Sequence, residues 1–133
     1  MRPIFHLSFP VTNMETAIHF YVSHLGAEVG RQAETFTDIL LFGAQITLQN
    51  DSGNVTAPMP RSRHFGATIA WDHWERLAHA FKDEAFVVEP AKVSYQGQPI
   101  EQGKFMLRDP SSNFIEIKAY RSPSDVLGAL ADQ

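Results

Sequence analysis

Two histidines and one glutamate stand where they could bind a metal ion together. His6, His64 and Glu116 each lie in a short segment in which apolar and polar residues alternate. Such alternation is typical of β-strands and places each of these side chains on the face opposite its apolar neighbours. A charged group in such a strand is costly to bury unless it is paired or bound to a metal. Two imidazoles and one carboxylate form a known facial set for a divalent transition metal, with positions left open for water, substrate or O₂.

Each of these residues also has an ordinary structural interpretation. A single histidine in a strand most often makes a hydrogen bond within the fold, and Glu116 shares its predicted face with Lys118, as an exposed strand residue would. The metal-site hypothesis therefore depends on whether the fold brings the three side chains together, and so on the elements that carry them.

Those elements occur twice along the chain. Each half has a segment with strand periodicity, a segment with helical spacing and three more short strand-like segments. The predicted elements are strands at 4–11, 28–33, 36–42 and 45–49 with a helix at 14–25, and strands at 64–70, 86–89, 104–108 and 113–119 with a helix through Trp74 and Phe81. Thr12 with Glu15, and Asp72 with Glu75, have the capping-box spacing that marks the beginning of a helix.

The repeat can be aligned residue by residue. His6 matches His64, and residues 46–49 match residues 115–118, so that Thr47 corresponds to Glu116. Two βαβββ units of this size are too small to be separate domains. We therefore expect one α+β domain over residues 1–133, with module one at about 4–50, module two at about 63–120 and a short tail at 121–133. Its curved mixed sheet would surround a metal-binding cleft, with the helices outside.

Composition excludes several classes of protein. The 133 residues carry 11 Lys+Arg and 15 Asp+Glu, a formal net charge of −4, and 44% of them are hydrophobic, as in an ordinary soluble domain. The acidic balance without a Lys/Arg cluster argues against nucleic-acid binding. The longest apolar run, at 39–44, is far shorter than the ~20 residues of a membrane helix. The absence of cysteine excludes thiolate metal sites and is consistent with a cytoplasmic protein.

The chain resembles the vicinal oxygen chelate superfamily over residues 4–120. The resemblance rests on Phe5-His6-Leu7-Ser8, on Asn13-Met14-Glu15-Thr16-Ala17-Ile18-His19-Phe20-Tyr21, on His64-Phe65-Gly66, and on Asp109-Pro110-Ser111-Ser112-Asn113-Phe114-Ile115-Glu116, which is close to the family signature Asp-Pro-x-x-Asn-x-x-Glu. The superfamily includes glyoxalases, extradiol dioxygenases and bleomycin- and fosfomycin-resistance proteins. The resemblance implies a homodimer and metal ligands on the first, fourth, fifth and eighth strands.

His6, His64 and Glu116 match the family's ligands on the first, fifth and eighth strands. Thr47 stands at the fourth, where glyoxalase I-type enzymes have a carboxylate, and a threonine cannot accept a proton at neutral pH. The three-ligand set is similar to that of extradiol dioxygenases, which use Fe(II), and of fosfomycin thiol transferases, which use Mn(II). It implies an Fe(II) extradiol-dioxygenase-like enzyme whose small substrate carries vicinal oxygens. The alternatives are a non-oxidative Mn, Ni or Zn enzyme (glyoxalase-, epimerase- or thiol-transferase-like) and a non-catalytic, antibiotic-resistance-type protein that binds a small ligand.

The catalytic groups beside Glu116 are harder to assign from the resemblance. Extradiol enzymes carry an active-site tyrosine on the strand before the glutamate strand, but the corresponding residues 104–108 contain Met106 and no tyrosine. We expect a loop at 91–103 to close over the cleft. The candidate catalytic residues are Glu116 itself and three residues of this loop, Tyr95, Gln98 and Glu101, with Lys118 as a further acid–base candidate.

Overall fold

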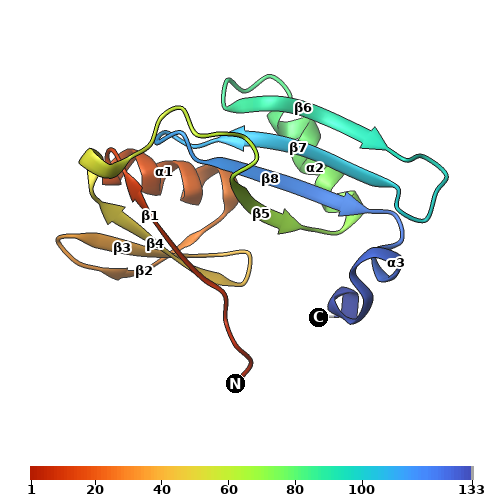
Figure 1. The fold of residues 1–133 in the computed structure, drawn as a ribbon, viewed down its shortest axis with the longest axis horizontal. Helices are drawn as coiled ribbons and strands as arrows, with labels where there is room; N and C mark the ends of the chain where they lie inside the picture. Colours follow the sequence, from red (N-terminus) through yellow and green to blue (C-terminus); the bar gives the residue numbers. More distant parts are fainter. Residues whose placement is uncertain (133) are drawn as a thin grey trace. The chain divides into compact units, whose positions relative to one another are not determined.

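The structure is a computed structural model that describes residues 1–132, and its contacts divide the chain into two compact units. Unit 1 contains Met1–Pro60 and the turn Asp109–Asn113. Unit 2 contains Arg61–Arg108 and the chain from Phe114 onward. Each unit has its own sheet and its own helix on one face of that sheet (Figure 1).

Unit 1 is built from one helix and a four-stranded mixed sheet. Its elements are β1 (His6–Val11), α1 (Met14–Leu25), β2 (Glu28–Gln32), β3 (Phe36–Leu41), β4 (Ala44–Asn50) and the short 3₁₀ helix η1 (Ser52–Asn54). The strand order is β1-β4-β3-β2, with β1 parallel to β4 and the other pairs antiparallel. Helix α1 packs against β2, β3 and β4. The apolar side chains buried there include Val11, Ala17, Phe20, Tyr21, Ile39, Ile46 and Leu48.

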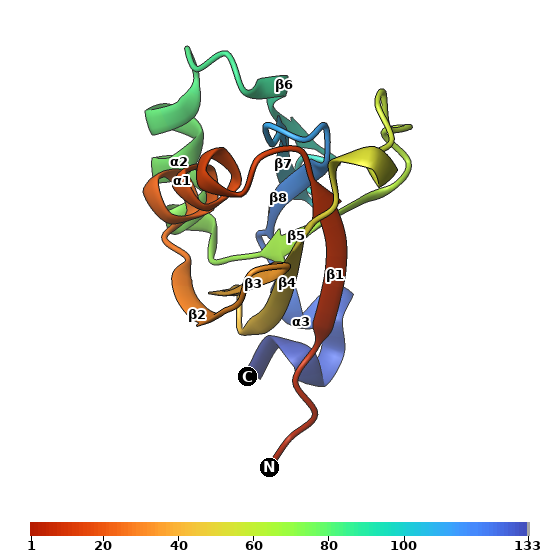
Figure 2. The same cartoon turned by 90° about the vertical axis from the view of Figure 1, so that its left-hand side faces the viewer.

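Unit 2 repeats this plan with the same topology. Its elements are β5 (His64–Thr68), α2 (Trp71–Phe81), β6 (Val87–Ser94), β7 (Gln102–Arg108), β8 (Phe114–Tyr120), α3 (Pro123–Leu127) and the 3₁₀ helix η2 (Gly128–Asp132). The strand order is β5-β8-β7-β6, and β5 is parallel to β8. Helix α2 packs against β6, β7 and β8 (Figure 2). The buried side chains include Trp74, Phe81, Phe105, Leu107, Ile115 and Ile117.

The two βαβββ modules predicted from the sequence are confirmed, and so is their alignment. In unit 1, Ser8 lies opposite Thr47 across the parallel pair β1–β4. In unit 2, Gly66 lies opposite Glu116 across the parallel pair β5–β8. Because Ser8 follows His6 by two residues and Gly66 follows His64 by two residues, Thr47 and Glu116 occupy equivalent positions in the two sheets.

The predicted cap of the first helix is wrong by one residue. Asn13 is the N-cap of α1, with an extended backbone, and its side-chain oxygen accepts a hydrogen bond from the Thr16 N–H at 3.0 Å. Asn ranks at least as high as Thr at the N-cap, so the propensity of Asn13 is consistent with the observed cap. Thr12 instead donates its own N–H to Ser111 Oγ at 2.9 Å.

The predicted capping box of the second helix is also wrong. Helix α2 begins at Trp71, and its N-cap, Ala70, makes no side-chain capping bond. Asp72 lies inside the first turn, where its carboxylate accepts hydrogen bonds from the His73 N–H and from Arg76. A carboxylate in the first turn is favourable beside the positive end of the helix dipole, without being the cap.

The predicted loop at 91–103 is much shorter in the structure. Strand β6 continues to Ser94 and β7 begins at Gln102, which leaves a turn at 95–101. The length of this strand was not evident from the sequence, because β6 contains Pro90 and its register with β7 is irregular. Proline is tolerated there because β6 is an edge strand of its sheet.

The Asp-Pro-Ser-Ser-Asn motif forms a turn fastened to α1 within unit 1. Asp109 Oδ1 accepts hydrogen bonds from the N–H groups of Ser111 and Asn113, each at 2.8 Å. Its Oδ2 accepts a 2.6 Å hydrogen bond from the hydroxyl of Tyr21. Burial, the charge of Asp109 and this hydrogen bond raise the pKa of Tyr21 well above its usual value. The aspartate of the motif therefore has a structural role: it shapes the turn and binds a buried phenol.

No helix within residues 1–132 combines the length and the apolar character needed to cross a membrane.

Candidate functional site

Two of the three predicted metal ligands lie side by side in unit 2. His64 begins β5 and Glu116 lies in the neighbouring strand β8, with His64 Nε2 at 3.9 Å from Glu116 Oε1. Their side chains are 32% and 13% exposed, respectively. Both side chains lie on the sheet face opposite α2, because Ile115 and Ile117, which flank Glu116 in β8, are fully buried on the other face. The alternation of these strands therefore predicted their common face.

A hydrogen bond sets which nitrogen of His64 is free. His64 Nδ1 lies 2.7 Å from the backbone carbonyl oxygen of Arg61. A carbonyl oxygen can only accept, so Nδ1 must carry the proton of this bond. In the neutral ring, Nε2 is then an unprotonated acceptor on the side of Glu116. Metal-binding histidines are commonly held in this way, with the other ring nitrogen donating to a carbonyl or carboxylate.

Glu116 has a lysine on its own strand and a glycine opposite it on the neighbouring strand. Lys118 Nζ lies 3.6 Å from Glu116 Oε1. Burial alone would lower the pKa of Lys118, but its contacts with Tyr120 and Glu116 outweigh burial, so this pKa lies above its usual value. Gly66, opposite Glu116 on β5, has no side chain to cover the carboxylate.

The carboxylate of Glu116 borders a pocket of about 440 Å³ in unit 2. The pocket lies over the sheet formed by β6, β7 and β8. Its lining residues are Glu89, Pro90, Ala91, Lys92, Lys104, Phe105, Met106 and Glu116. The volume is within the range of small-molecule sites.

The third predicted ligand, His6, lies in unit 1. It is exposed at the beginning of β1, opposite Gln45 of β4. Among residues 1–132, no group of three or more His, Asp or Glu side chains forms a metal-binding cluster. The three-ligand set stays a prediction, and unit 2 brings two of its members together.

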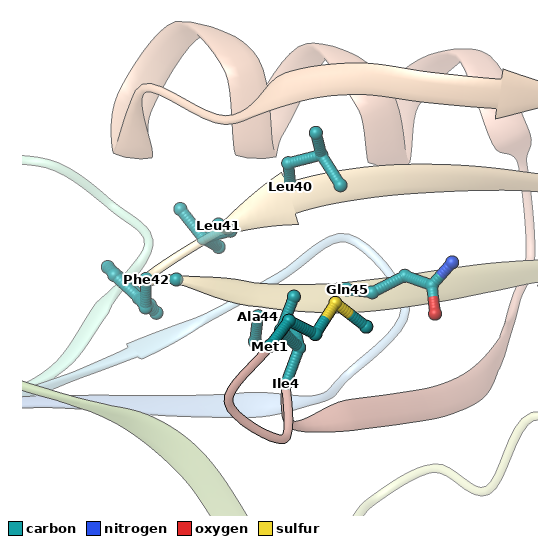
Figure 3. A pocket seen from close by; sticks show the side chains of 8 residues that line it. Met1, Ile4, Leu40, Leu41, Phe42, Ala44 and Gln45 are labelled. Carbon is teal, nitrogen blue, oxygen red and sulfur yellow. The ribbon is translucent and has the colours of Figure 1, made fainter.

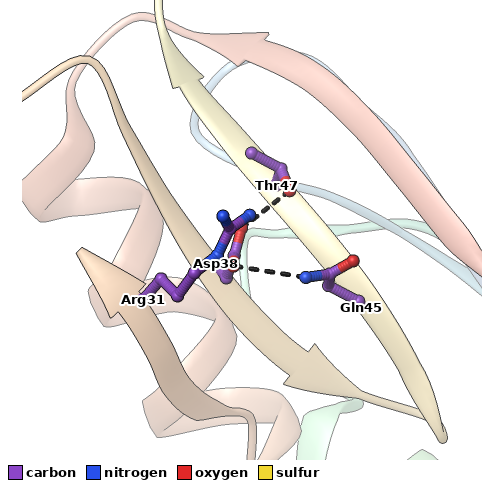
Figure 4. A network of polar contacts seen from close by, with 4 residues as sticks. All are labelled: Arg31, Asp38, Gln45 and Thr47. Atoms are coloured by element: carbon purple, nitrogen blue, oxygen red, sulfur yellow. Dashed lines mark hydrogen bonds and ion pairs between the residues drawn. The ribbon is translucent and has the colours of Figure 1, made fainter. Parts of the chain in front are cut away.

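The structure adds one carboxylate that the sequence analysis missed. Asp38 lies on β3 directly opposite Thr47, and its side chain is only 2% exposed (Figure 4). Asp38 Oδ1 accepts a hydrogen bond from the Thr47 hydroxyl at 2.7 Å. Its Oδ2 accepts from Arg31 Nε at 2.6 Å and from Gln45 Nε2 at 3.3 Å. A charged residue within the apolar run of β3 was the signal that could have revealed it.

These contacts decide what Asp38 can do. The hydrogen bond from Arg31 is the largest influence on its pKa; burial opposes it, and Thr47 and Gln45 reinforce it, so the pKa of Asp38 lies below its usual value. Both carboxylate oxygens are already in use. Asp38 is therefore a poor proton acceptor in this arrangement, although it lies next to the fourth-strand position of Thr47.

We expect Asp38→Asn to lower the free energy of unfolding at pH 7 by about 2 kcal/mol, because hydrogen bonds to a charged group are lost. Arg31 is largely exposed, so its share is reduced by solvent, and the buried bond from Thr47 matters most. The folded pKa is lowered, so the stabilisation is present above the unfolded value of about 3.9 and disappears as the pH falls through the folded value.

Urea unfolding of both proteins between pH 7 and pH 3 measures this difference, which should shrink toward acid pH. The matched control is Asp83→Asn, which removes an exposed carboxylate after α2 and should change stability by less than about 0.5 kcal/mol. Equal stability of Asp38→Asn and wild type at pH 7 would contradict this account of the network.

The other predicted catalytic residues lie in the turn between β6 and β7. Tyr95 is 50% exposed and has a left-handed backbone conformation, and its carbonyl accepts a hydrogen bond from the Gln98 N–H at 3.0 Å. Glu101 accepts hydrogen bonds from the Gly97 N–H at 2.9 Å and from Arg121 Nε at 3.3 Å. Through these two hydrogen bonds Glu101 stabilises the conformation of the turn. A catalytic role for the three residues stays a prediction.

Unit 1 has a second pocket, of about 650 Å³, at the β3–β4 hairpin (Figure 3). Its lining residues are Met1, Ile4, Leu40, Leu41, Phe42, Gly43, Ala44 and Gln45, and most of them are apolar. Gln45 is the register partner of His6. An apolar surface therefore lies next to the strand position of the predicted ligand in unit 1.

Comparison with known proteins agrees with the observed fold. Residues 4–117 match the profile of the Glyoxalase/Bleomycin resistance protein/Dioxygenase superfamily. No curated protein matches the chain significantly. A solved glyoxalase/bleomycin resistance protein/dioxygenase from Alicyclobacillus acidocaldarius is 26% identical, with a TM-score of 0.76 over 93% of this chain and 96% of that one.

A second similar structure has a more distant sequence. The fosfomycin resistance protein FosX from Listeria monocytogenes is 14% identical, with a TM-score of 0.74 over 95% of this chain and 99% of that one. At this identity the similarity shows the fold alone. The profile match covers most of the chain, including both β-strands that carry the predicted histidines and the first part of β8 with Glu116. The chain therefore belongs to the glyoxalase/bleomycin resistance protein/dioxygenase superfamily, the vicinal oxygen chelate proteins.

Proposed function

We propose that this protein is a metal-dependent enzyme, an Fe(II) extradiol-dioxygenase-like protein that acts on a small substrate with vicinal oxygens. His6, His64 and Glu116 would hold the metal. The observation that carries the proposal is the orientation of His64: its Nδ1–H donates to the Arg61 carbonyl, so that Nε2 is the ring nitrogen left for a metal, 3.9 Å from a carboxylate oxygen.

The imidazole and carboxylate of unit 2 are ligand types that suit a divalent metal. In a facial set, two ligand atoms about 2.1 Å from one ion lie about 3.0 Å apart, so His64 Nε2 and Glu116 Oε1, which are 3.9 Å apart, would move closer together to bind one ion. When bound, the metal would act as a template and stabilise the negative charge of a substrate that chelates it through two oxygens. His6 supports the set because it occupies in β1 the position that His64 occupies in β5.

The chain's own groups have separate parts in this proposal. The Arg61 carbonyl keeps the proton on Nδ1, so that Nε2 stays a ligand atom. Glu116 reduces the net charge of the centre, and Lys118 beside it restrains the carboxylate. Tyr95, Gln98 and Glu101 are the proposed groups for proton transfer or substrate orientation, from the turn that joins β6 and β7. We also expect the protein to form a homodimer.

A non-oxidative Mn, Ni or Zn enzyme is the second candidate, and one observation favours it. Met106 lies directly opposite Glu116 on β7, the strand on which extradiol enzymes carry a tyrosine. A thioether cannot transfer a proton, so the acid–base chemistry of ring cleavage would need another residue.

Thermal unfolding of metal-free protein under anaerobic conditions tests the proposal, with Fe(II), Mn(II), Ni(II) and Zn(II) added in turn. A native-state ligand at about a hundred times its dissociation constant stabilises by about 2.7 kcal/mol. For a chain of this size we expect the melting temperature to rise by roughly 10 °C with the preferred metal. Oxygen uptake with a panel of catechols then follows for the protein reconstituted with Fe(II).

The outcomes separate the candidates. The strongest stabilisation by Fe(II), together with oxygen uptake, supports the dioxygenase. Stabilisation by Mn(II) or Ni(II) without oxygen uptake supports the non-oxidative enzyme. No stabilisation by any of the four metals contradicts both and leaves a small-ligand-binding protein as the better explanation.

A further inference from the structure

Three lysines form a row across adjacent strands of unit 2. Lys92 of β6 lies opposite Lys104 of β7, and Lys104 lies opposite Lys118 of β8. Residues directly opposite each other in antiparallel strands point to the same face, with their Cβ atoms about 5 Å apart, and like charges in such pairs destabilise a sheet. The arrangement costs stability unless something negative lies against it.

The protein itself neutralises only part of this charge. Glu116 lies 3.6 Å from Lys118, and Glu89, the other carboxylate of this face, lies 3.8 Å from Arg61. Within residues 1–132, Lys92 and Lys104 have no ion-pair partner, although Lys104 is half-buried. Two ammonium groups on one sheet face therefore have no carboxylate partner, and of these Lys92 is exposed to solvent while Lys104 is half-buried.

These two lysines line the pocket that Glu116 borders. Lys92 and Lys104 contribute to its wall, and Glu116 lies on the strand at its other side. Met106 of β7 also lines the pocket, between its two register partners, Glu89 of β6 and Glu116 of β8. A small molecule in this pocket could reach Glu116 with one end and the lysines with the other.

We propose that Lys92 and Lys104 form an anion-binding subsite that holds a carboxylate or phosphate group of the substrate. The inference rests on the proposed function, since it places the reacting end of the substrate at Glu116, and it defines the substrate class as an anionic small molecule. Lys118 forms an ion pair with Glu116, and its charge reduces the repulsion between that carboxylate and the bound anion. A charge-assisted pair with each free lysine orients the bound molecule.

Anion titrations of metal-free protein at low ionic strength, followed by ¹H–¹⁵N NMR, test the subsite directly. The probes are inorganic phosphate, benzoate and the neutral benzamide. We expect Lys92→Gln/Lys104→Gln to weaken benzoate or phosphate binding by about tenfold or more, because two charged hydrogen bonds are lost. Benzamide should bind wild type more weakly than benzoate does and should be unaffected by the double substitution. Stronger binding of benzoate than of phosphate identifies the group as a carboxylate, and the reverse order identifies a phosphate.

The control is Lys82→Gln, which removes one lysine charge from the C-cap of α2, outside the pocket lining. Its effect on anion binding should stay below about twofold, because an exposed charge away from the pocket is screened. The double variant should be at least as stable as wild type in urea, since a repulsion has been removed. Equal weakening by Lys82→Gln, or no weakening by the double variant, would overturn the subsite.

The metal titration of the double variant separates this inference from the proposed function. We expect it to keep the full metal-dependent rise in melting temperature. If a metal stabilises the protein but anion binding does not depend on the two lysines, the anion-binding subsite is contradicted and the proposed function is not. If anion binding depends on the two lysines but no metal stabilises the protein, the proposed metal enzyme is contradicted and the anion-binding subsite is supported.

Discussion

Glu116→Ala is expected to abolish the thermal stabilisation that the preferred metal gives the wild-type protein. The substitution removes the only carboxylate of the proposed ligand set and leaves the two imidazoles of His6 and His64. Groups that merely orient a ligand already account for about 10- to 100-fold in metal affinity, so the loss of a ligand should exceed about 100-fold. Melting curves at a fixed metal concentration, and titrations of the metal-free variant, measure the change.

Glu89→Ala is the matched control for this experiment. Glu89 is a carboxylate on the same sheet face and lines the same pocket, but it pairs with Arg61 and is not a proposed ligand. Its substitution should leave the metal-dependent rise in melting temperature within about 2 °C of wild type, because a surface ion pair contributes little. Equal metal affinity in Glu116→Ala and wild type would exclude Glu116 as a ligand and, with it, the proposed site.

Gly66→Ala is expected to destabilise the protein by about 3–5 kcal/mol, among the largest effects of a single substitution. A Cβ atom at Gly66 would lie 1.8 Å from the carbonyl oxygen of Glu116 and 2.7 Å from its carbonyl carbon. These are backbone atoms of the neighbouring strand, so a side-chain rotation cannot relieve the contact. The pair β5–β8 must separate, and this moves the two strands that carry His64 and Glu116.

Urea unfolding and metal titration together test the expected effect of Gly66→Ala. Urea unfolding gives the loss of stability, with Gly53→Ala as the control, because a Cβ at Gly53 meets no atom within 4 Å. If the variant is folded at low temperature, its metal affinity should fall as well, since the spacing of the two ligand strands has changed. Unfolding of Gly66→Ala at the same urea concentration as wild type would contradict the close approach of β5 and β8.

Much of the fold could be predicted because its signals are local. The alternation around His64 and Glu116 placed both side chains away from α2, and the structure confirms that face. The equivalence of Thr47 and Glu116 followed from matching two short segments, and the strand registers bear it out. In both cases the information lies within a few consecutive residues.

Other features could not be predicted, since they depend on neighbours that are distant in the chain. At the beginning of α1, Thr12 bonds to Ser111, which is distant in the chain. The neighbouring Asn13 is therefore the N-cap and accepts the hydrogen bond from Thr16. Pro90 interrupts the sequence pattern of β6, yet pairing with β7 extends this strand to Ser94. Local propensity was outweighed by tertiary contacts in each instance.

The sequence by itself determined the two βαβββ modules, the superfamily and the sheet face on which His64 and Glu116 lie, because side chains alternate along a strand whatever that strand pairs with. Only the tertiary structure decided which residues become neighbours across strands. It placed Asp38 against Thr47, aligned Lys92 with Lys104, and set Gly66 against the backbone of Glu116. The physical reason is that register is set by the packing of the whole sheet, and a shift by one residue would turn each of these side chains to the opposite face.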